Sequence, residues 1–405
     1  MNAAPAPSLT SFGLEWAVFS GLAALLVGIG LSRFGYTPLV PALIQEGWLD
    51  PSQAAYAGAA NLAGYLTGAV AVARLRRHEL ELPLMRAALA ACALSFVACG
   101  WPLGFAWFSA WRVLSGIAGA VLMVLTPQRV LAVAPVRWRG RVGGIIFLGV
   151  GLGIALSAVV TPWMLELGLA RTWWSLAALS ALLTALAWRG LPEGPASAGP
   201  SGGHVASAAG RSATASLAAD PRVMLIAAAY SLSAAGYAPH TVFWVDFIAR
   251  GLGAGMRAGA ANWALLGLAA AAAPPLLGLL ADRIGFAAAF RAGMVLGAIS
   301  VGLPLVSTAP WSLAGSSLGV GGCITGCTSL ASARLAGILP EGRRRAVWGW
   351  MTTGFSVFFA AGGYGASYLF GRAGGYGLLF GIGAAAFAAA AAVDSSASLI
   401  PEARP

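Results

Sequence analysis

Twelve long apolar runs follow one another along almost the whole chain. Each is close to or above about 20 residues, the length that a helix needs to cross a bilayer. Hydrophobic residues make up 59% of the 405 positions and charged residues only 9%, whereas a soluble domain carries roughly 25% charged residues. The surroundings of this chain must therefore be lipid. The runs cover residues 14–42, 53–73, 83–101, 104–128, 142–165, 171–189, 223–249, 257–280, 286–307, 311–333, 346–370 and 376–393.

The uninterrupted apolar character of these runs decides between the two structures that lipid permits. Backbone polar groups in a bilayer must be satisfied within the protein, which leaves helices or closed barrels. A barrel strand alternates apolar and polar residues over about 10 positions, and these runs do not alternate. We therefore expect an all-α integral membrane protein with twelve transmembrane helices, whose partner is the lipid bilayer.

The arginines of the chain are distributed unequally between the segments on the two sides of the membrane. There is no lysine, so the formal net charge of +11 comes from 24 arginines. With the amino terminus in the cytoplasm, the cytoplasmic segments hold 18 arginines and the outer segments hold only Arg171, Arg250, Arg257 and Arg372. This is the asymmetry of the positive-inside rule, and it places both termini in the cytoplasm. A nucleic-acid partner is not indicated.

Two segments repeat each other at one offset of 201 residues. The segment 35–38 (Gly-Tyr-Thr-Pro) recurs as 236–239 (Gly-Tyr-Ala-Pro), and 57–61 (Ala-Gly-Ala-Ala-Asn) recurs as 258–262. Such internal repeats in an apolar chain are typical of transporters. The repeat predicts two pseudo-symmetric six-helix bundles, 1–190 and 223–405. Between them, 191–222 is rich in Gly, Ala, Ser and Pro and is expected to be a flexible cytoplasmic linker.

Two motifs resemble signatures of the major facilitator superfamily. Residues 278–285 (Gly-Leu-Leu-Ala-Asp-Arg-Ile-Gly) resemble its loop signature, and 112–119 (Arg-x-x-x-Gly-x-x-Gly) resemble its second signature. The resemblance implies that Asp282 and Arg283 form a charge-relay latch between helix ends, with Gly278 and Gly285 permitting close packing. The corresponding loop after the second helix keeps only its basic end.

A narrower resemblance is to the YbfB/YjiJ branch of this superfamily. It is carried by 33–41 (Arg-Phe-x-Tyr-Thr-Pro-x-x-Pro), by 61–68 (Asn-x-x-Gly-Tyr-Leu-x-Gly) and by 229–243. The resemblance implies a monomeric carrier in a bacterial inner membrane, either proton-driven or facilitative and without a cofactor. Its two bundles would rock around a midplane substrate site, the mechanism of alternating access.

Two arginines lie within the apolar runs, where charges are costly and usually functional. At about 1.5 Å per residue, Arg33 lies about 18 Å below the outer end of the first helix and Arg112 about 12 Å deep in the fourth. In the superfamily fold both helices line the central cavity. A guanidinium group suits a carboxylate or phosphate, so we expect a cationic patch for an organic anion. The alternative is that one of them bonds backbone carbonyls or holds helices together, and Arg112 is the favoured candidate for that role.

The candidates for proton coupling lie in the C-terminal half. A histidine titrates in the physiological range, so His240 could carry a proton or bind substrate, but a lone histidine in a helix bundle is commonly just hydrogen-bonded. Asp246 maps by the repeat onto Gln45 at the outer end of the first helix, so we expect a solvated end residue. Coupling could also run through the substrate's own proton.

Further candidate substrate-binding residues are two tyrosines and two asparagines on the repeat, Tyr36, Tyr237, Asn61 and Asn262. For the asparagines the expected role is an interhelical hydrogen bond across the pseudo-twofold axis, worth about 1 kcal/mol, and gating is the alternative. Glycines 143, 144, 149, 151 and 153 predict that the fifth helix packs closely against a neighbour. The four cysteines (92, 99, 323 and 327) are expected to be buried and to bind no metal.

Enzymatic functions find no support in the sequence. It contains no Walker loop, no nucleophile elbow and no clustered metal ligands. The function that we expect is secondary transport of a small organic solute, with an anion as the leading class. The alternatives are an efflux carrier for amphiphilic metabolites or drugs, and a non-transporting membrane sensor on a carrier fold.

Overall fold

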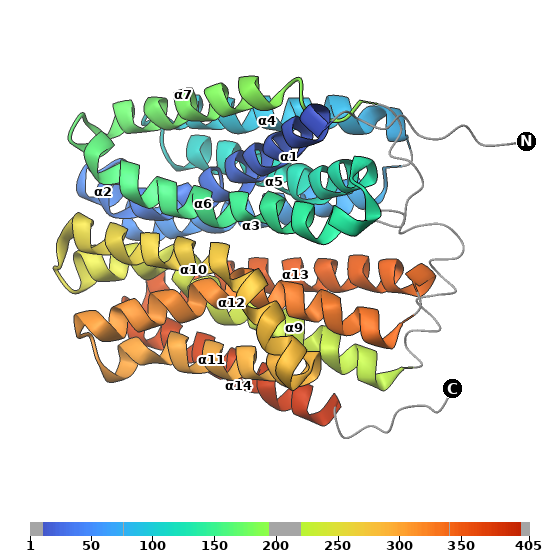
Figure 1. Cartoon of the computed structure of the whole chain (residues 1–405). Helices are drawn as coiled ribbons and strands as arrows, with labels where there is room; N and C mark the ends of the chain where they lie inside the picture. Colours follow the sequence, from blue (N-terminus) through green and yellow to red (C-terminus); the bar gives the residue numbers. More distant parts are fainter. Residues whose placement is uncertain (1–10, 76, 194–219, 340, 398–405) are drawn as a thin grey trace, which may run out of the picture.

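The computed structural model describes residues 11–75, 77–193, 220–339 and 341–397. Within these residues, twelve long helical segments run back and forth across the molecule (Figure 1). The first segment is broken into α1 (Ser11–Leu25), a π-helical stretch (Leu26–Leu31), a 3-10 stretch (Phe34–Leu39) and α2 (Val40–Gln45). The others are α3 (Pro51–Ala73), α4 (Glu81–Cys99), α5 (Phe105–Val133), α6 (Arg139–Leu165), α7 (Leu169–Ala187), α9 (Pro221–Asp246), α10 (Gly255–Ile284), α11 (Phe286–Val306), α12 (Pro310–Ile338), α13 (Glu341–Ala373) and α14 (Tyr376–Ala397). The predicted all-α fold with twelve helices is confirmed.

The composition of the helices fits a multi-pass membrane protein. Of the segments that the structure describes, eight are long and apolar enough to cross a bilayer, among them the broken first one taken as Gly13–Gln45. The four below that threshold, α3, α9, α12 and α13, have 23 to 33 residues and are long enough. Exposed tryptophans gather at both ends of the bundle, as in the aromatic belts of membrane proteins: Trp16, Trp138 and Trp188 at one end, and Trp101, Trp163, Trp174 and Trp311 at the other.

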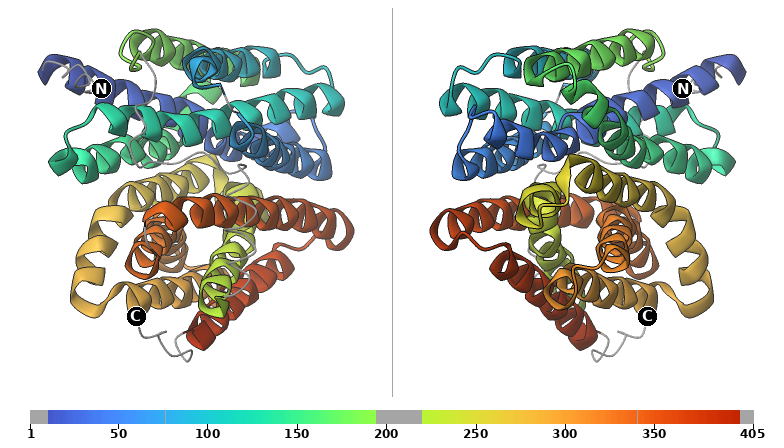
Figure 2. Two further views of the ribbon diagram at one scale, coloured as in Figure 1. Left: turned by 90° about the vertical axis from the view of Figure 1, so that its right-hand side faces the viewer. Right: turned by 90° about the vertical axis from the view of Figure 1, so that its left-hand side faces the viewer.

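The helices form two bundles that lie one against the other (Figures 1 and 2). Helices α1 to α7 make the N-terminal bundle and α9 to α14 the C-terminal one, in agreement with the predicted pair of six-helix bundles. The main contacts between the bundles are α6 with α10 and α3 with α13. Most of the expected linker, 191–222, lies outside the described residues, including all of 194–219.

Helix starts follow from local capping. Asp50 accepts a hydrogen bond from the backbone N–H of Gln53 (2.8 Å), and the Gln53 side chain accepts one from the Asp50 N–H (3.2 Å), a capping box that begins α3. Asp220 caps α9 by accepting from the N–H of Arg222 at 3.0 Å. In both helices a proline fills the first position, where no N–H is needed.

The glycines of α6 permit close helix packing at three of the five expected positions. A Cβ atom at Gly149 would lie 2.2 Å from the carbonyl oxygen of Leu22, and one at Gly153 would lie 2.6 Å from the Cα of Gly30. At Gly151 a Cβ would lie 2.4 Å from the backbone nitrogen of Ala271 in the other bundle. Gly143 and Gly144 make no such approach. The four cysteines are buried and free, as predicted.

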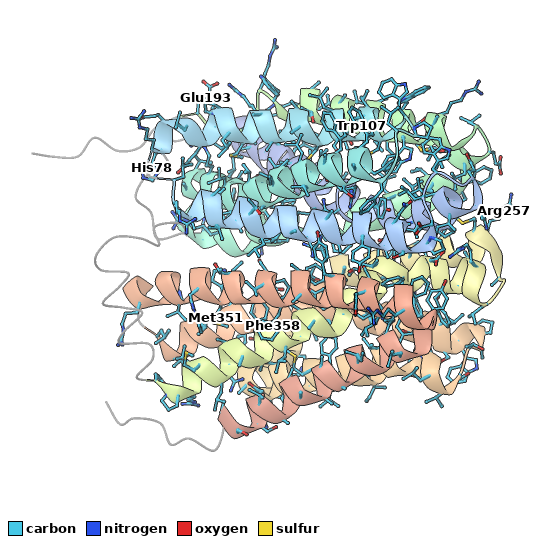
Figure 3. All side chains as sticks on the ribbon, turned by 180° about the vertical axis from the view of Figure 1, so that it is seen from behind. His78, Trp107, Glu193, Arg257, Met351 and Phe358 are labelled. Carbon is cyan, nitrogen blue, oxygen red and sulfur yellow. The ribbon has the colours of Figure 1, made fainter. Side chains whose placement is uncertain are left out.

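The two bundles meet at one side of the molecule. We call the end where α1 begins and α14 ends the termini side; Figure 3 shows His78 and Glu193 there and Arg257 at the opposite side. Contacts between the bundles run from the middle to the opposite side, from Gly151 against Ala271 to the ion pair of Glu166 with Arg257 (3.4 Å).

The same faces of α6 and α10 separate toward the termini side. Gly144 lies seven residues from Gly151, and Gly278 lies seven from Ala271, so each stays on the face that meets the other bundle. A Cβ at either glycine would meet nothing within 4 Å. The interface between the bundles is therefore closed at the opposite side and parted at the termini side.

Candidate functional site

The site is built on the break in the first helix. Between Leu26 and Leu39 the backbone passes from π-helical to 3-10 geometry, and all of these residues except Arg33 are buried. Glycines at positions 28, 30 and 35 have low helix preference, and Pro38 lacks the N–H of a regular helix. This break makes backbone carbonyl groups near the middle of the membrane available to side chains.

Arg112 on α5 bonds two of these carbonyls. Its Nη1 donates to the Ser32 oxygen (2.6 Å) and its Nη2 to the Arg33 oxygen (3.4 Å), while its guanidinium lies 4.5 Å from the ring centre of Tyr36. The side chain is 2% exposed. These are the contacts of the alternative interpretation, in which Arg112 bonds backbone carbonyls and holds the helices together.

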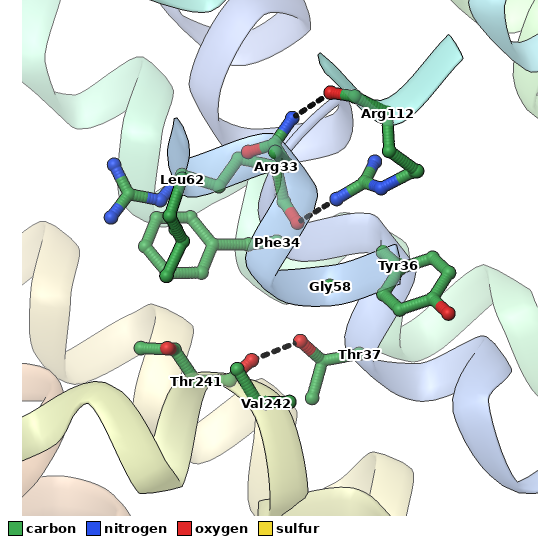
Figure 4. Close-up of a pocket in the computed structure, with 10 residues that line it drawn as sticks. Arg33, Phe34, Tyr36, Thr37, Gly58, Leu62, Arg112, Thr241 and Val242 are labelled. Carbon is green, nitrogen blue, oxygen red and sulfur yellow. Dashed lines mark hydrogen bonds between the residues drawn. The ribbon is translucent and has the colours of Figure 1, made fainter. Parts of the chain in front are cut away.

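Arg33 has entirely different surroundings. Its guanidinium carbon lies 4.2 Å from the ring centre of Phe359 and 5.1 Å from those of Phe34 and Tyr65. Phe359 belongs to α13, so rings from both bundles enclose this cation. Among the described residues no carboxylate pairs with it. Figure 4 shows the two guanidinium groups on opposite sides of the helix backbone, although both residues line the small cavity described below.

The two repeat tyrosines are used differently. The Tyr36 hydroxyl donates to the carbonyl oxygen of Ala54 on α3 at 2.8 Å, a contact within the N-terminal bundle. The Tyr237 ring lies 5.1 Å from that of Phe359, and within the described part of the chain its hydroxyl has no hydrogen-bond partner. Tyr237 therefore lies beside the rings that surround Arg33, and its hydroxyl bonds no described residue. The Tyr36 hydroxyl, in contrast, is used in a bond that joins two helices.

The two repeat asparagines bond a serine within their own bundles. Asn61 donates to the Ser115 hydroxyl of α5 at 2.8 Å, and the Ser317 hydroxyl of α12 donates to Asn262 at 3.1 Å. The bonds are interhelical as expected, but neither crosses between the bundles. The prediction of a bond across the pseudo-twofold axis was wrong because each serine lies on the neighbouring helix of the same bundle.

A small cavity lies beside the helix break (Figure 4). Its volume is about 10 Å³, room for about one water molecule. On one side the Thr37 hydroxyl donates to the Thr241 carbonyl oxygen at 2.5 Å and so joins the bundles. The lining residues are Arg33, Phe34, Tyr36, Thr37, Gly58, Asn61, Leu62, Arg112, Thr241 and Val242; Tyr237, His240 and Asn262 lie outside this cavity.

The two candidates for proton coupling are both buried. The His240 Nε2 lies 2.9 Å from the Ser316 hydroxyl, and its ring stacks on Trp244 at 4.4 Å. Asp246 is 1% exposed; it pairs with Arg250 (2.5 Å) and accepts from the Tyr376 hydroxyl at 2.6 Å. The expectation of a solvated Asp246 was wrong because helix packing continues past it into the π-helical stretch Phe247–Gly251.

The expected latch residues lie apart from other charges. Asp282 and Arg283 are exposed, and neither forms an ion pair with another described residue. A Cβ atom at Gly278 would meet no other atom within 4 Å, so this glycine is not needed for close packing. Gly285 takes a φ of +85° and ends α10. In this conformation the latch is therefore not formed, and Gly285 serves a turn instead of close packing.

Ion pairs at the termini side tie helices within each bundle. Arg129 on α5 pairs with Glu81 on α4 at 3.0 Å. In the C-terminal bundle, Asp394 on α14 pairs with Arg334 and, at 3.4 Å, with Arg291. Sequence reasoning did not assign these pairs, and it gave no role to Tyr65 or Phe359. Tyr65 stood in a quoted motif, but Phe359 lies in a run of Phe, Ala and Gly that offers no signal.

Comparisons with known proteins also indicate a transporter. A family model described as "Uncharacterised MFS-type transporter YbfB" matches residues 25–395. No curated protein matches the chain. The structure is similar to a bacterial homologue of the human lysosomal transporter Spinster in an inward-facing and unoccupied conformation, at 14% identity and a TM-score of 0.68, with 96% of each chain covered. It is also similar to a D-xylose–proton symporter, at 17% identity and a TM-score of 0.71, with 96% of this chain and 98% of that chain covered. At these identities the likeness concerns the fold.

Proposed function

Because the chain belongs to the family of the MFS-type transporter YbfB, we propose that it carries a small organic anion across a bacterial inner membrane. The two bundles rock about a midplane site that contains Arg33, and the site faces each side of the membrane in turn. If both termini are cytoplasmic, as the arginine distribution predicts, the conformation described above is closed outside and parted toward the cytoplasm.

The observation that carries the proposal is the state of Arg33. A charged side chain in the membrane is costly and normally pairs or faces a functional pathway. Aromatic rings lie 4.2 to 5.1 Å from the Arg33 guanidinium carbon, and among the described residues no carboxylate pairs with it. A substrate carboxylate would supply the missing countercharge and two parallel hydrogen bonds to the guanidinium.

Proton coupling is part of the proposal, through His240 or Asp246. Both lie on α9, which reaches from the interface with the N-terminal bundle to the outer side. Asp246 is held by Arg250 and Tyr376 near the end that must open for outward-facing states. Opening of that end would expose the carboxylate to outside protons.

Thermal stabilisation of the purified protein tests the proposal. A panel of small organic anions, cations and neutral solutes is applied to the wild type, to Arg33→Ala and to Arg372→Ala. The last variant is the matched control, since Arg372 also stacks on a ring, that of Tyr368 (4.9 Å), but is exposed at the outer end. An anion at about a hundredfold its Kd adds roughly 2.7 kcal/mol.

The outcomes separate the alternatives. Stabilisation by anions in the wild type and in Arg372→Ala, but not in Arg33→Ala, supports the anion carrier. Stabilisation only by bulky cations or neutral amphiphiles would favour the efflux carrier. Binding without flux of the bound solute in proteoliposomes would favour a membrane sensor.

A further inference from the structure

We infer that the carried anion is an aromatic carboxylate, and that the hydroxyl groups of Tyr65 and Tyr237 bind its carboxylate together with Arg33. The inference rests on the proposed function and names its substrate class. Among the described residues neither tyrosine hydroxyl has a hydrogen-bond partner, and the row of rings beside Arg33 leads toward the parted side of the molecule.

Three aromatic rings lie against the guanidinium of Arg33. Phe359, Phe34 and Tyr65 lie within 4.2 to 5.1 Å of its central carbon. The two terminal nitrogens have no hydrogen-bond partner within the described residues. A carboxylate binds a guanidinium in the plane of its N–H groups, so the two terminal nitrogens are the atoms that would bind this anion.

Tyr65 and Tyr237, one from each bundle, lie in the ring cluster around this cation. Tyr65 on α3 stacks directly on Arg33, and Tyr237 on α9 contacts Phe359, the ring closest to the guanidinium. The hydroxyls of two other buried tyrosines form hydrogen bonds within the protein: Tyr36 donates to Ala54 and Tyr230 to Thr328 (3.3 Å). The hydroxyls of Tyr65 and Tyr237 have no such bond among the described residues and are available to a ligand.

A row of rings continues from Arg33 toward the termini side. Tyr237 lies 6.1 Å from Phe355, Phe355 lies 4.7 Å from Tyr230, and Tyr230 lies 5.6 Å from Trp348. Phe355 and Trp348 are half-buried, and Trp348, Phe355 and Phe359 share one face of α13 because they are seven and four residues apart. An anion that enters from the parted side thus meets aromatic faces before it meets the cation.

Ligand entry requires Phe359 to leave Arg33. The cavity beside Arg33, about 10 Å³, has no room for a carboxylate. Phe359 lies on α13 of the other bundle, so its withdrawal is a movement of one bundle against the other. An aromatic ligand replaces the ring contacts that Arg33 and Tyr237 then lose, whereas a saturated ligand of the same size does not.

Titration calorimetry of the purified full-length chain in lipid nanodiscs tests the inference with three matched probes. Phenylacetate carries the ring and the carboxylate, cyclohexylacetate has the carboxylate on a saturated ring, and 2-phenylethanol has the ring without the charge. We expect phenylacetate to bind about tenfold more tightly than cyclohexylacetate, a difference of about 1.4 kcal/mol. The alcohol should not bind measurably.

Three variants assign the roles of the residues. Tyr65→Phe and Tyr237→Phe each weaken phenylacetate binding by about tenfold, the loss of one hydrogen bond to a charged group. Tyr364→Phe, at an exposed ring between the bundles, is the control and leaves the affinity unchanged. Phe359→Leu reduces the preference for phenylacetate over cyclohexylacetate. The melting temperature of each variant without ligand shows that it is folded.

Failure of the inference differs from failure of the proposed function. Equal affinities for the two acids, with both abolished in Arg33→Ala, overturn the aromatic substrate class and leave the anion carrier standing. Unchanged binding in both tyrosine variants overturns their role in holding the carboxylate. If the alcohol binds as tightly as the acid, or if Arg33→Ala binds phenylacetate normally, the anion carrier itself is wrong.

Discussion

Tyr36 and Tyr237 occupy equivalent positions of the internal repeat but have different partners. In the N-terminal bundle the Tyr36 hydroxyl bonds Ala54 and its ring lies under Arg112. In the C-terminal bundle Tyr237 keeps its hydroxyl free of described partners and lies in a row of rings. The repeat places Ala234 opposite Arg33. The N-terminal bundle therefore supplies a cation and fixes the helix that carries it, and the C-terminal bundle supplies the rings that cover it.

The candidate proton carriers, in contrast to the cation Arg33, lie in the C-terminal bundle. His240 and Asp246 of the C-terminal bundle correspond to Leu39 and Gln45 of the N-terminal one. A pseudo-symmetric frame can thus hold an asymmetric site: the cation lies in one bundle and the candidate proton carriers lie in the other. Relative movement of the bundles would then change the distance between these charges, which is a physical basis for coupling.

The largest effect is expected on proton coupling, which should be lost on substitutions in the C-terminal bundle alone. We expect His240→Asn or Asp246→Asn, whichever removes the proposed proton carrier of α9, to abolish accumulation driven by a pH gradient in proteoliposomes. Exchange of substrate without a gradient should persist. Coupling retained in both variants would assign it to the substrate's own proton or to another group.

A large effect on stability is expected from the N-terminal bundle. Arg112→Met removes the donors to the Ser32 and Arg33 carbonyls, and a buried unsatisfied group costs roughly 1 to 3 kcal/mol. The variant should lose about 3 kcal/mol or more of its stability, measured by thermal unfolding in detergent. Arg33→Met, which breaks no hydrogen bond among the described residues, is the control and should unfold near the wild-type temperature. A similar loss in both would refute the division between a structural and a binding arginine.

Much of the fold was predictable because lipid leaves few alternatives. Run length and apolar content fixed the twelve helices, and the repeat indicated two bundles. The dense glycines of α6 predicted close packing, and Gly149, Gly151 and Gly153 achieve it. Such features are local or periodic, so they can be read without knowledge of which helices become neighbours.

The arrangement of the site was less predictable because it depends on rotation of helices about their axes. Depth along a helix placed Arg33 and Arg112 at similar levels, but depth does not say which way a side chain points. Phe359 approaches Arg33 only because α13 packs beside α3. Asp246 was misjudged for the same reason, since Tyr376 reaches it from α14.

A smaller effect separates the two repeat tyrosines by stability. Tyr36→Phe loses the bond to Ala54, whose carbonyl keeps its bond within α3, so we expect a loss of about 1 kcal/mol. Tyr237→Phe gives up no bond to a described residue and should leave the melting temperature unchanged. Thermal unfolding of the two variants side by side measures the difference. Equal losses would mean that the Tyr237 hydroxyl also has a structural partner.

The smallest effect concerns the feature that both bundles share, the bond between an asparagine and a serine. Ser115→Ala and Ser317→Ala each remove one interhelical bond, worth about 0.6 kcal/mol on average within membranes. Ser317 also accepts from the buried indole N–H of Trp244 at 2.9 Å. Ser317→Ala should therefore cost more than Ser115→Ala, since it leaves that donor unsatisfied.

Thermal unfolding of the two serine variants, and of Trp244→Phe combined with Ser317→Ala, distinguishes the contributions. Without the indole, no donor is stranded by the loss of the serine, so removing Ser317 from the Trp244→Phe background should cost about as much as removing Ser115 from the wild type. If the cost of removing Ser317 stays larger in that background, the asymmetry lies in the Asn262 bond itself. The two bundles would then differ even at the positions where their sequences repeat.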